Sequence, residues 1–391
     1  MKDGLSIAFT GDIGFDGYMN GKWNDEELIS GEVMDFIASC DHVCVNVEGA
    51  LSAKEKVNRK NTVAALTHSM DPEVTGFLKR IKADIWNICN NHIMDAGPDG
   101  LFDTLDEAKA AGASTIGAGM DINEASRPLI IPDAGGIGIF AVGYQRACRK
   151  ADENTAGCLS WSDLDRIRAN IDNIKKTCRH CVIVAHAGEE FTALPSPYTR
   201  ERYLKYLEMG ADIVVAHHPH VPMNYETVGD KAIFYSLGNF VFDTDYQRSQ
   251  YYTEYGIVLK INFTKDSFSF ESMGIKTDRD AEKVVKDRLP DIFTDISEGE
   301  YNLLLPLSAK AFLEATKRQQ TYLYPDKYKN ATEKDWHENF YEPLRSGRVP
   351  GETLDLQIIC PIAEKEKEKA WEKSKLEGVK EYILKMLKPI S

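Results

Sequence analysis

The chain has 391 residues, a formal net charge of −14 at pH 7, and 43% hydrophobic residues. This hydrophobic content allows a sizeable core and argues against a disordered chain, and at about 150 residues per domain the length suggests two or three domains. The 61 acidic residues outnumber the 47 basic ones. Nucleic acid is therefore disfavoured as the main partner, because binding of its phosphates relies on a dense basic surface.

The sequence carries no targeting or membrane signal that we can identify. Its N-terminus has no charged segment followed by an apolar one, and no apolar run reaches the roughly 18 residues that a membrane helix needs. Eight cysteines are scattered along the chain, several within apolar runs, and we interpret them as reduced core thiols. We therefore expect a soluble cytoplasmic protein without a membrane segment; an anchor outside the sequence given stays open as an alternative.

The first two predicted strands each lead to a carboxylate. The first, Leu5–Phe9, is followed by Asp12, which is either a metal ligand or part of an ordinary Gly-Asp turn. The second, Val43–Val47, carries Asn46 and Glu48 at its carboxyl end. Burying a glutamate there is costly unless a cation pairs with it. The basic stretch that follows, Lys54–Lys60, is either a solvated loop or a contact for an anionic substrate.

The third predicted strand, Ala83–Cys89, runs into a dense polar cluster. Asn91 offers a neutral oxygen ligand, His92 is suited to proton transfer, and Asp95 is placed to orient His92. The alternative is an asparagine-rich helix cap.

Histidines follow two later strands. Cys181–Ala185 leads to His186, and Ile213–Val215 leads into three histidines within four residues. We expect an extended segment in which His218 and His220 face the same way, as ligands for a transition metal. Two solvated loop histidines are the alternative.

Helices are expected between the strands and after about residue 265, where the sequence becomes more charged. They are Glu26–Ala38, Pro72–Lys82, Leu101–Ala111, Trp161–Thr177, Tyr198–Met209, Glu282–Arg288, Pro306–Arg318, Thr332–Arg345 and Ala363–Leu387. We thus expect one domain at 1–264 and a helical extension at 265–391 that packs on it.

The interpretation of this sequence as a metal protein rests on one shared feature. Several polar side chains follow the carboxyl ends of separate apolar strands. They are Asp12, Glu48, Asn91, His92, His186, His218 and His220. Strands that alternate with helices predict a layered α/β sandwich whose strand ends share one edge. Imidazole, carboxylate and amide groups that converge there have the composition of a dinuclear metal site.

Together these motifs resemble the CapA family, the capsule or poly-γ-glutamate synthesis proteins, a branch of the calcineurin-like metallophosphoesterase superfamily. The resemblance covers residues 5 to 243 and rests on motifs in the family's order. They are Gly11-Asp12, Asn46-Val-Glu48, Asn90-Asn91-His92 with Asp95 and Gly97, His186-x-Gly188-x-Glu190, Gly210-Ala-Asp212 with His218-Pro-His220, and Ser236-Leu-Gly-Asn-Phe240.

The resemblance implies a four-layer αββα sandwich with a helical C-terminal extension and two divalent metal ions, which are Mn, Fe or Zn. It implies that Asp12 and His220 hold one ion, that Asn91, His186 and His218 hold the other, and that Glu48 bridges both. His92 would give a proton to the leaving group, with Asp95 beside it. Asn46, Glu190 and Asn239 would support the ligands or orient the substrate.

Three departures from the family pattern stand out, and one of them, alanine at positions 187 and 216, affects packing more than chemistry. The phosphoesterases have a histidine where this chain has Gly14, so the first ion has fewer ligands unless Asp16 replaces it. Members of the family are typically anchored in a membrane, and this sequence shows no anchor.

Two functions follow. One is a metal-dependent hydrolase of a phosphate ester or a γ-glutamyl-type amide, with an anionic small molecule or polymer as substrate. The other is a non-catalytic accessory that binds the polymer during poly-γ-glutamate synthesis or export. The pairing of His92 with Asp95 favours the hydrolase, whereas the family name favours the accessory.

Overall fold

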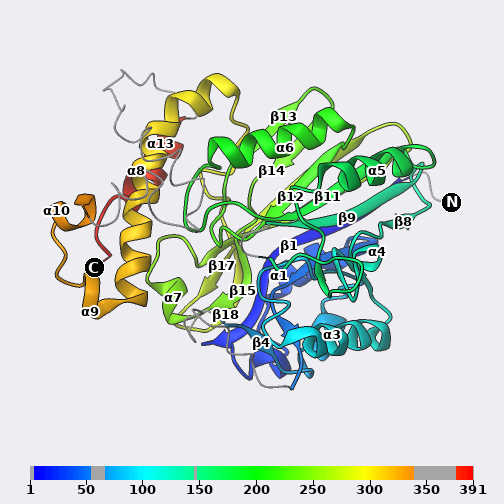
Figure 1. Cartoon of the computed structure of the whole chain (residues 1–391), viewed down its shortest axis with the longest axis horizontal. Coiled ribbons are helices and arrows are strands. Elements are labelled where there is room, and N and C mark those ends of the chain that lie inside the picture. Colours follow the sequence, from blue (N-terminus) through cyan, green and yellow to red (C-terminus); the bar gives the residue numbers. More distant parts are fainter. Residues whose placement is uncertain (1–3, 54–66, 145–147, 339–375, 391) are drawn as a thin grey trace.

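The computed structural model describes residues 4–53, 67–144, 148–338 and 376–390, and its centre is a pair of β-sheets stacked face to face (Figure 1). Among these residues, the first sheet has the order β18 (Lys283–Asp287), β17 (Phe268–Asp278), β16 (Tyr255–Thr264), β1 (Gly4–Gly17), β2 (His42–Val47), β5 (Ile85–Asn87) and β6 (Ser114–Ile116), with β15 (Asn239–Asp243) also paired to β1. The second has the order β13 (Tyr225–Val228), β14 (Lys231–Phe234), β12 (Ile213–His217), β11 (His180–His186), β9 (Ile137–Gly143) and β8 (Leu129–Ile131).

The strands that lead to the site are parallel within each sheet. In the first sheet β15, β1, β2, β5 and β6 run parallel, and in the second β9, β11, β12 and β14 do. Parallel strands place their carboxyl ends at one edge, which is where open α/β sheets bind ligands. Two further strand pairs are short: β3 (Ala50–Leu51) with β4 (Ser69–Met70), and β7 (Ala118–Gly119) with β10 (Gly157–Cys158).

Helices cover both outer faces of the sheet pair. Those of the described residues are η1 (Lys22–Asn24), α1 (Gly31–Ala38), α2 (Val74–Arg80), α3 (Gly97–Ala111), α4 (Ile122–Ala125), α5 (Leu164–Lys175), α6 (Pro197–Met209), α7 (Asp245–Arg248), α8 (Glu298–Leu323), α9 (Pro325–Tyr328), α10 (Glu333–Trp336) and α13 (Leu376–Met386). Figure 1 shows α5 and α6 outside the second sheet and α3 on the opposite side.

The core lies between the sheets and under the helices. Phe9 and Val45 of the first sheet pack in one buried cluster with Val184 and Val215 of the second. Alternate residues of the second sheet, among them Ile183, pack instead in a cluster with α5 and α6. Strands buried on both faces explain the continuous apolar runs. The predicted four-layer α/β sandwich is confirmed.

Two of the expected elements differ from the structure. β1 does not end at Phe9 but continues to Gly17, with an irregular register near Asp12, so Asp12 lies inside the strand. The prediction of a helix at Glu282–Arg288 is wrong, because β18 occupies most of that segment and pairs with β17. The first sheet therefore extends past the expected boundary at residue 264.

The helical part of the chain begins at α8. Ser297 and Glu300 form a capping box that satisfies backbone groups at its N-terminus. Helices α8 and α13 share a buried cluster with Phe191 and Tyr246 of the sandwich, and Figure 1 shows them together at one end of the sheets. That this helical part is a separate domain stays a prediction.

Some sequence predictions fall outside the described residues. They concern Lys54–Lys60, the end of the expected helix 332–345, and the start of the expected helix 363–387. In the described part of the chain, no helix has the length and apolar character needed to cross a membrane, and no disulfide links the cysteines.

Candidate metal centre

The strands of the first sheet bring two carboxylates together beneath the shared edge. Asp12 lies in β1 between Asn46 of β2 and Asn239 of β15, and its backbone N–H donates to the Gly238 carbonyl at 2.9 Å. Glu48 follows β2 directly. Both carboxylates are completely buried. Charges buried in this way need a compensating partner.

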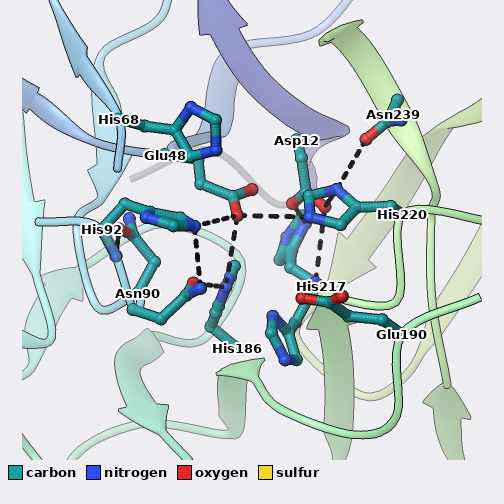
Figure 2. A network of polar contacts seen from close by, with 12 residues as sticks. Asp12, Glu48, His68, Asn90, His92, His186, Glu190, His217, His220 and Asn239 are labelled. Atoms are coloured by element: carbon teal, nitrogen blue, oxygen red, sulfur yellow. Dashed lines mark hydrogen bonds and ion pairs between the residues drawn. The ribbon is translucent and has the colours of Figure 1, made fainter. Parts of the chain in front are cut away.

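Glu48 has an oxygen without a hydrogen bond at the centre of the cluster (Figure 2). This atom, Oε1, lies 3.5 Å from His220 Nε2, 3.7 Å from His186 Nε2 and 4.0 Å from His92 Nε2. Two ligand atoms that each lie about 2.1 Å from one cation are about 3 to 4 Å apart. The spacing around this oxygen therefore fits a metal ion better than it fits hydrogen bonds.

Two candidate ligand groups share Glu48. One consists of Asp12, Glu48 and His220, and the other of Glu48, His186 and His218; all their side chains are buried. Within each group the ligand atoms lie within 4.8 Å of one another. Imidazole and carboxylate ligands without a thiolate suit zinc, manganese or iron. The donor set of each group thus fits a divalent ion.

Asn91 lies next to the second group. Its Oδ1 is 2.8 Å from His186 Nε2, and its Nδ2 is 2.9 Å from His92 Nε2. The Asn91 oxygen and the His186 nitrogen therefore point toward the same place, as expected if both bind one ion.

The segment after β12 is not extended as the sequence predicted. His218 and His220 have φ angles of 99° and 58°. These left-handed values are unfavourable for a residue with a side chain and are typical of functional sites. The turn places the two rings in different ligand groups, with 6.3 Å between their centroids.

His92 and Asp95 form a second unit beside the ligands. Asp95 Oδ2 lies 2.7 Å from His92 Nδ1 and also accepts the backbone N–H of His68 at 2.9 Å. Because Nδ1 faces a carboxylate, His92 presents Nε2 to the metal centre. The structure thus brings His92 and Asp95 into contact, and their role in proton transfer stays a prediction.

Burial sets the protonation of most of the histidines. It lowers the pKa of His186 and His218, and it lowers the pKa of His92 together with the nearby His68 ring. These imidazoles are consequently neutral at pH 7, which is the form that binds a metal ion.

The charges around Glu48 act differently. Burial by itself raises the pKa of Asp12, but contacts with His217 and His220 outweigh it and hold the pKa well below its usual range. Burial and then the Asp12 charge raise the pKa of Glu48. Burial by itself lowers the pKa of His220, but the charges of Glu48 and Asp12 raise it to about 10. A buried carboxylate with a raised pKa and an unpartnered oxygen is a position that a cation would stabilise.

The predicted supporting residues surround the ligands. Asn46 Nδ2 donates to Asp12 Oδ1 at 2.8 Å, and Asn239 Oδ1 lies 2.9 Å from His220 Nδ1. Glu190 lies beside the histidines (Figure 2). Its carboxylate accepts from Tyr246 and Gln319.

Sequence reasoning missed three residues at this site. His217, the last residue of β12, has Nδ1 3.2 Å from Asp12 Oδ1. His68 packs edge-on against His92, with 4.3 Å between the ring centroids, and Phe242 packs against both His68 and His220. His217 could have been found from its place in the histidine run. His68 and Phe242 follow no recognisable motif.

Asp16 lies outside both ligand groups of the described residues. Its carboxylate instead lies 2.6 Å from His68 Nδ1. The expected replacement of the missing histidine by Asp16 therefore has no support in this geometry.

Residues 6–244 match the family described as "Bacterial capsule synthesis protein PGA_cap". This chain belongs to that family. It is 30% identical over 253 residues to the PGA biosynthesis protein CapA of Bacillus subtilis. This alignment covers 63% of this chain and 66% of the relative. It is 28% identical over 230 residues to the capsule biosynthesis protein CapA of Bacillus anthracis, covering 57% of this chain and 56% of the relative. The chain thus spans less than two thirds of the length of either relative.

Two solved structures align with part of the PGA_cap chain. A crystal structure of TT1561 from Thermus thermophilus matches 68% of this chain and 98% of its own, with 11% identity and a TM-score of 0.39. A purple acid phosphatase from yellow lupin seeds matches 75% of this chain and 55% of its own, with 9% identity and a TM-score of 0.32.

Proposed function

We propose that this PGA_cap protein is a hydrolase that uses two divalent metal ions and cleaves a phosphate ester or a γ-glutamyl-type amide in capsule or poly-γ-glutamate metabolism. The observation that carries the proposal is Glu48 Oε1, which is buried, lacks a hydrogen bond, and belongs to both ligand groups. The names of the Bacillus relatives supply the metabolic context.

In this mechanism each side chain has one task. Asp12 and His220 would hold one ion, Asn91, His186 and His218 would hold the other, and Glu48 would serve as a ligand in both groups. Bound divalent ions would supply a nucleophile from water at neutral pH and stabilisation of developing negative charge. Asn46 and Asn239 keep Asp12 and His220 oriented through the hydrogen bonds described above.

His92 handles the proton of the leaving group. Its Nδ1 is held by Asp95 and the ring is neutral at pH 7, so Nε2, which faces the centre, would first take up the proton of the attacking water and then pass it to the leaving group. Loss of such a group typically slows turnover by about 100-fold to 10,000-fold. A protein that only binds polymer has no need for a proton carrier at this position.

The first test is metal content together with turnover. Protein purified without chelator or nickel is expected to carry close to two equivalents of manganese, iron or zinc, and His218→Ala to lose at least one. His42→Ala is the matched control, because His42 pairs with Asp84 at a different place in the first sheet. His92→Ala is expected to retain its metal and lose turnover.

A non-catalytic accessory is the second candidate, favoured by the name of a 24% identical Mycobacterium tuberculosis relative, "Probable polyglutamine synthesis accessory protein". It predicts binding of anionic polymer that His92→Ala leaves unchanged. Protein that stays free of metal after reconstitution would contradict the hydrolase and leave this candidate standing.

A further inference from the structure

Helix α8 reaches the metal centre although it lies outside residues 6–244, the part that matches the family. Gln319 of α8 donates its Nε2 hydrogen to Glu190 Oε2 at 2.8 Å. Tyr246 Oη donates to the same oxygen at 2.8 Å, and Gln319 also contacts Tyr246 Oη. One oxygen of Glu190 is thus fixed by two donors, one of them from helix α8.

The loop that carries Glu190 is held against the metal ligands. Phe191 has a φ angle of 58°, donates its backbone N–H to the Pro219 carbonyl at 2.9 Å, and stacks on the His220 ring with 6.0 Å between centroids. Figure 2 shows the Glu190 carboxylate turned toward the histidine cluster. The position of Glu190 is therefore set by packing on both sides of the loop.

The second oxygen of Glu190 is available. Among the described residues Oε1 accepts no hydrogen bond, and the residue is only half-buried. Glu190 therefore places a carboxylate with one free acceptor oxygen beside the histidine ligands (Figure 2).

This charge discriminates between substrates. A carboxylate beside the centre repels the oxygens of a phosphate monoester, whereas it attracts an ammonium group and accepts its hydrogen bond. We propose that Glu190, held by Gln319 of α8, recognises a free amino group of the substrate, so that the substrate is an amide whose acyl part carries an ammonium, as a terminal γ-glutamyl unit does. This inference rests on the proposed hydrolase function and selects one of its two substrate classes.

The test compares three probes on the manganese-loaded protein: γ-glutamyl-p-nitroanilide in its D and L forms, the N-acetylated versions of both, and p-nitrophenyl phosphate. The wild type is expected to prefer the free amine. Glu190→Gln should raise KM for the free-amine probe by about 10-fold to 100-fold, as loss of a charge-assisted hydrogen bond does, and abolish the preference over the N-acetyl probe. The kcat should change much less than KM.

Gln319→Leu tests the part played by the helix. It should weaken the preference for the free amine partially, because Tyr246 still holds the Glu190 oxygen. Gln320→Leu is the matched control on the same helix, since the Gln320 side chain makes no hydrogen bond with the described residues. It should behave as the wild type.

Two outcomes in the kinetic assay would overturn the inference. One is equal or better cleavage of the N-acetyl probe by the wild type, or a preference for p-nitrophenyl phosphate. The other is a Glu190→Gln variant that loses kcat on every probe alike, which would place Glu190 in the chemistry.

Calorimetry on His92→Ala separates this inference from the proposed function. Tighter binding of the free-amine probe than of the N-acetyl probe, lost when Glu190→Gln is added, would support the inference even if no probe is cleaved by the wild type, and only the hydrolase would then fail. Equal binding of the two probes, or binding of neither, would refute the inference.

Discussion

Gly14 leaves room for an aromatic ring that packs on the metal centre. A Cβ at position 14 would lie 2.4 Å from Cε2 of Phe242, and this ring contacts His220 and His68 at centroid distances of 5.0 and 5.2 Å. The family pattern has a histidine at this position. In this chain the Phe242 ring takes that space and supports His220 from the side.

We expect Gly14→Ala to lower the free energy of unfolding by about 1–3 kcal/mol, because the methyl group forces the Phe242 ring to move within a close-packed site. Urea denaturation measures this, and metal content should fall with it if the ring supports His220. Gly76→Ala is the control. A Cβ there meets nothing within 4 Å, and Gly76 lies in helix α2, so it should stabilise the protein by about 0.5–1 kcal/mol. Equal effects of the two substitutions would contradict the steric argument.

Metal binding should depend on pH through His220. Its raised pKa, about 10, means that the ring carries a proton at neutral pH in the metal-free protein and must release it to bind an ion. Because the proton is held up to about pH 10, the affinity for the ion should increase by about tenfold per pH unit between pH 6.5 and 8. Calorimetric titration with manganese in buffers of different ionisation enthalpy measures both the slope and the released proton. An affinity that stays constant over this range would exclude His220 as the protonated ligand.

At the scale of elements, Tyr301 connects α8 to the loop beside the metal centre. Its hydroxyl donates to the Pro195 carbonyl at 2.9 Å within a buried cluster, and the Arg200 guanidinium lies 4.8 Å from its ring centroid. Tyr301→Phe removes the hydroxyl and keeps the ring, so it isolates the hydrogen bond. We expect a loss of about 1 kcal/mol in the free energy of unfolding.

The same change at Tyr324 serves as the reference for this measurement. Tyr324 is 44% exposed at the end of α8, and Tyr324→Phe should change stability by less than about 0.5 kcal/mol. Thermal or urea unfolding of both variants would decide the matter. A similar loss in both would mean that the Tyr301 hydroxyl does not anchor the helix.

The parallel strands of the sandwich could be predicted from sequence because apolar runs end abruptly in polar residues, as at Val47 and Glu48. β18 could not. It is an edge strand in which two valines stand between two lysines and an aspartate follows, and most of its residues are only half-buried. Lysines on an edge strand block further pairing of strands, but in the sequence they look like a charged helix.

The side chains of the candidate site divide in the same way. Those carried on strand ends were predictable, because parallel strands end at one edge. His68 was not, since it reaches His92 through a short pairing of β3 with β4 and through its backbone hydrogen bond to Asp95. Contacts made by such local pairings have no periodic signal in the sequence.

At the scale of the whole molecule, the candidate ligands come from both sheets. Asp12 and Glu48 belong to the first sheet, and His186 and His218 to the ends of strands in the second. An ion bound between them would couple the sheets, so the stability of the folded state should rise with the logarithm of the free ion concentration once this exceeds Kd. A free ion concentration 100 times its Kd adds about 2.7 kcal/mol for each ion. Thermal unfolding with increasing manganese, and again after EDTA, measures this gain.

Glu48→Gln should show whether Glu48 serves metal binding or the stability of the fold. The metal-free protein holds a buried carboxylate with a raised pKa and an oxygen that makes no hydrogen bond, and such an unsatisfied group costs about 1–3 kcal/mol. The neutral amide removes this cost but also the ion pair with the protonated His220, 3.5 Å away, so it should change the stability of the metal-free protein little while removing the stabilisation by manganese. Glu189→Gln is the opposite case, because both oxygens of Glu189 accept hydrogen bonds from Ser196, and it should destabilise the protein with and without metal. If Glu48→Gln destabilised the metal-free protein as Glu189→Gln does, Glu48 would be a structural residue of the sandwich and the shared-ligand interpretation would fail.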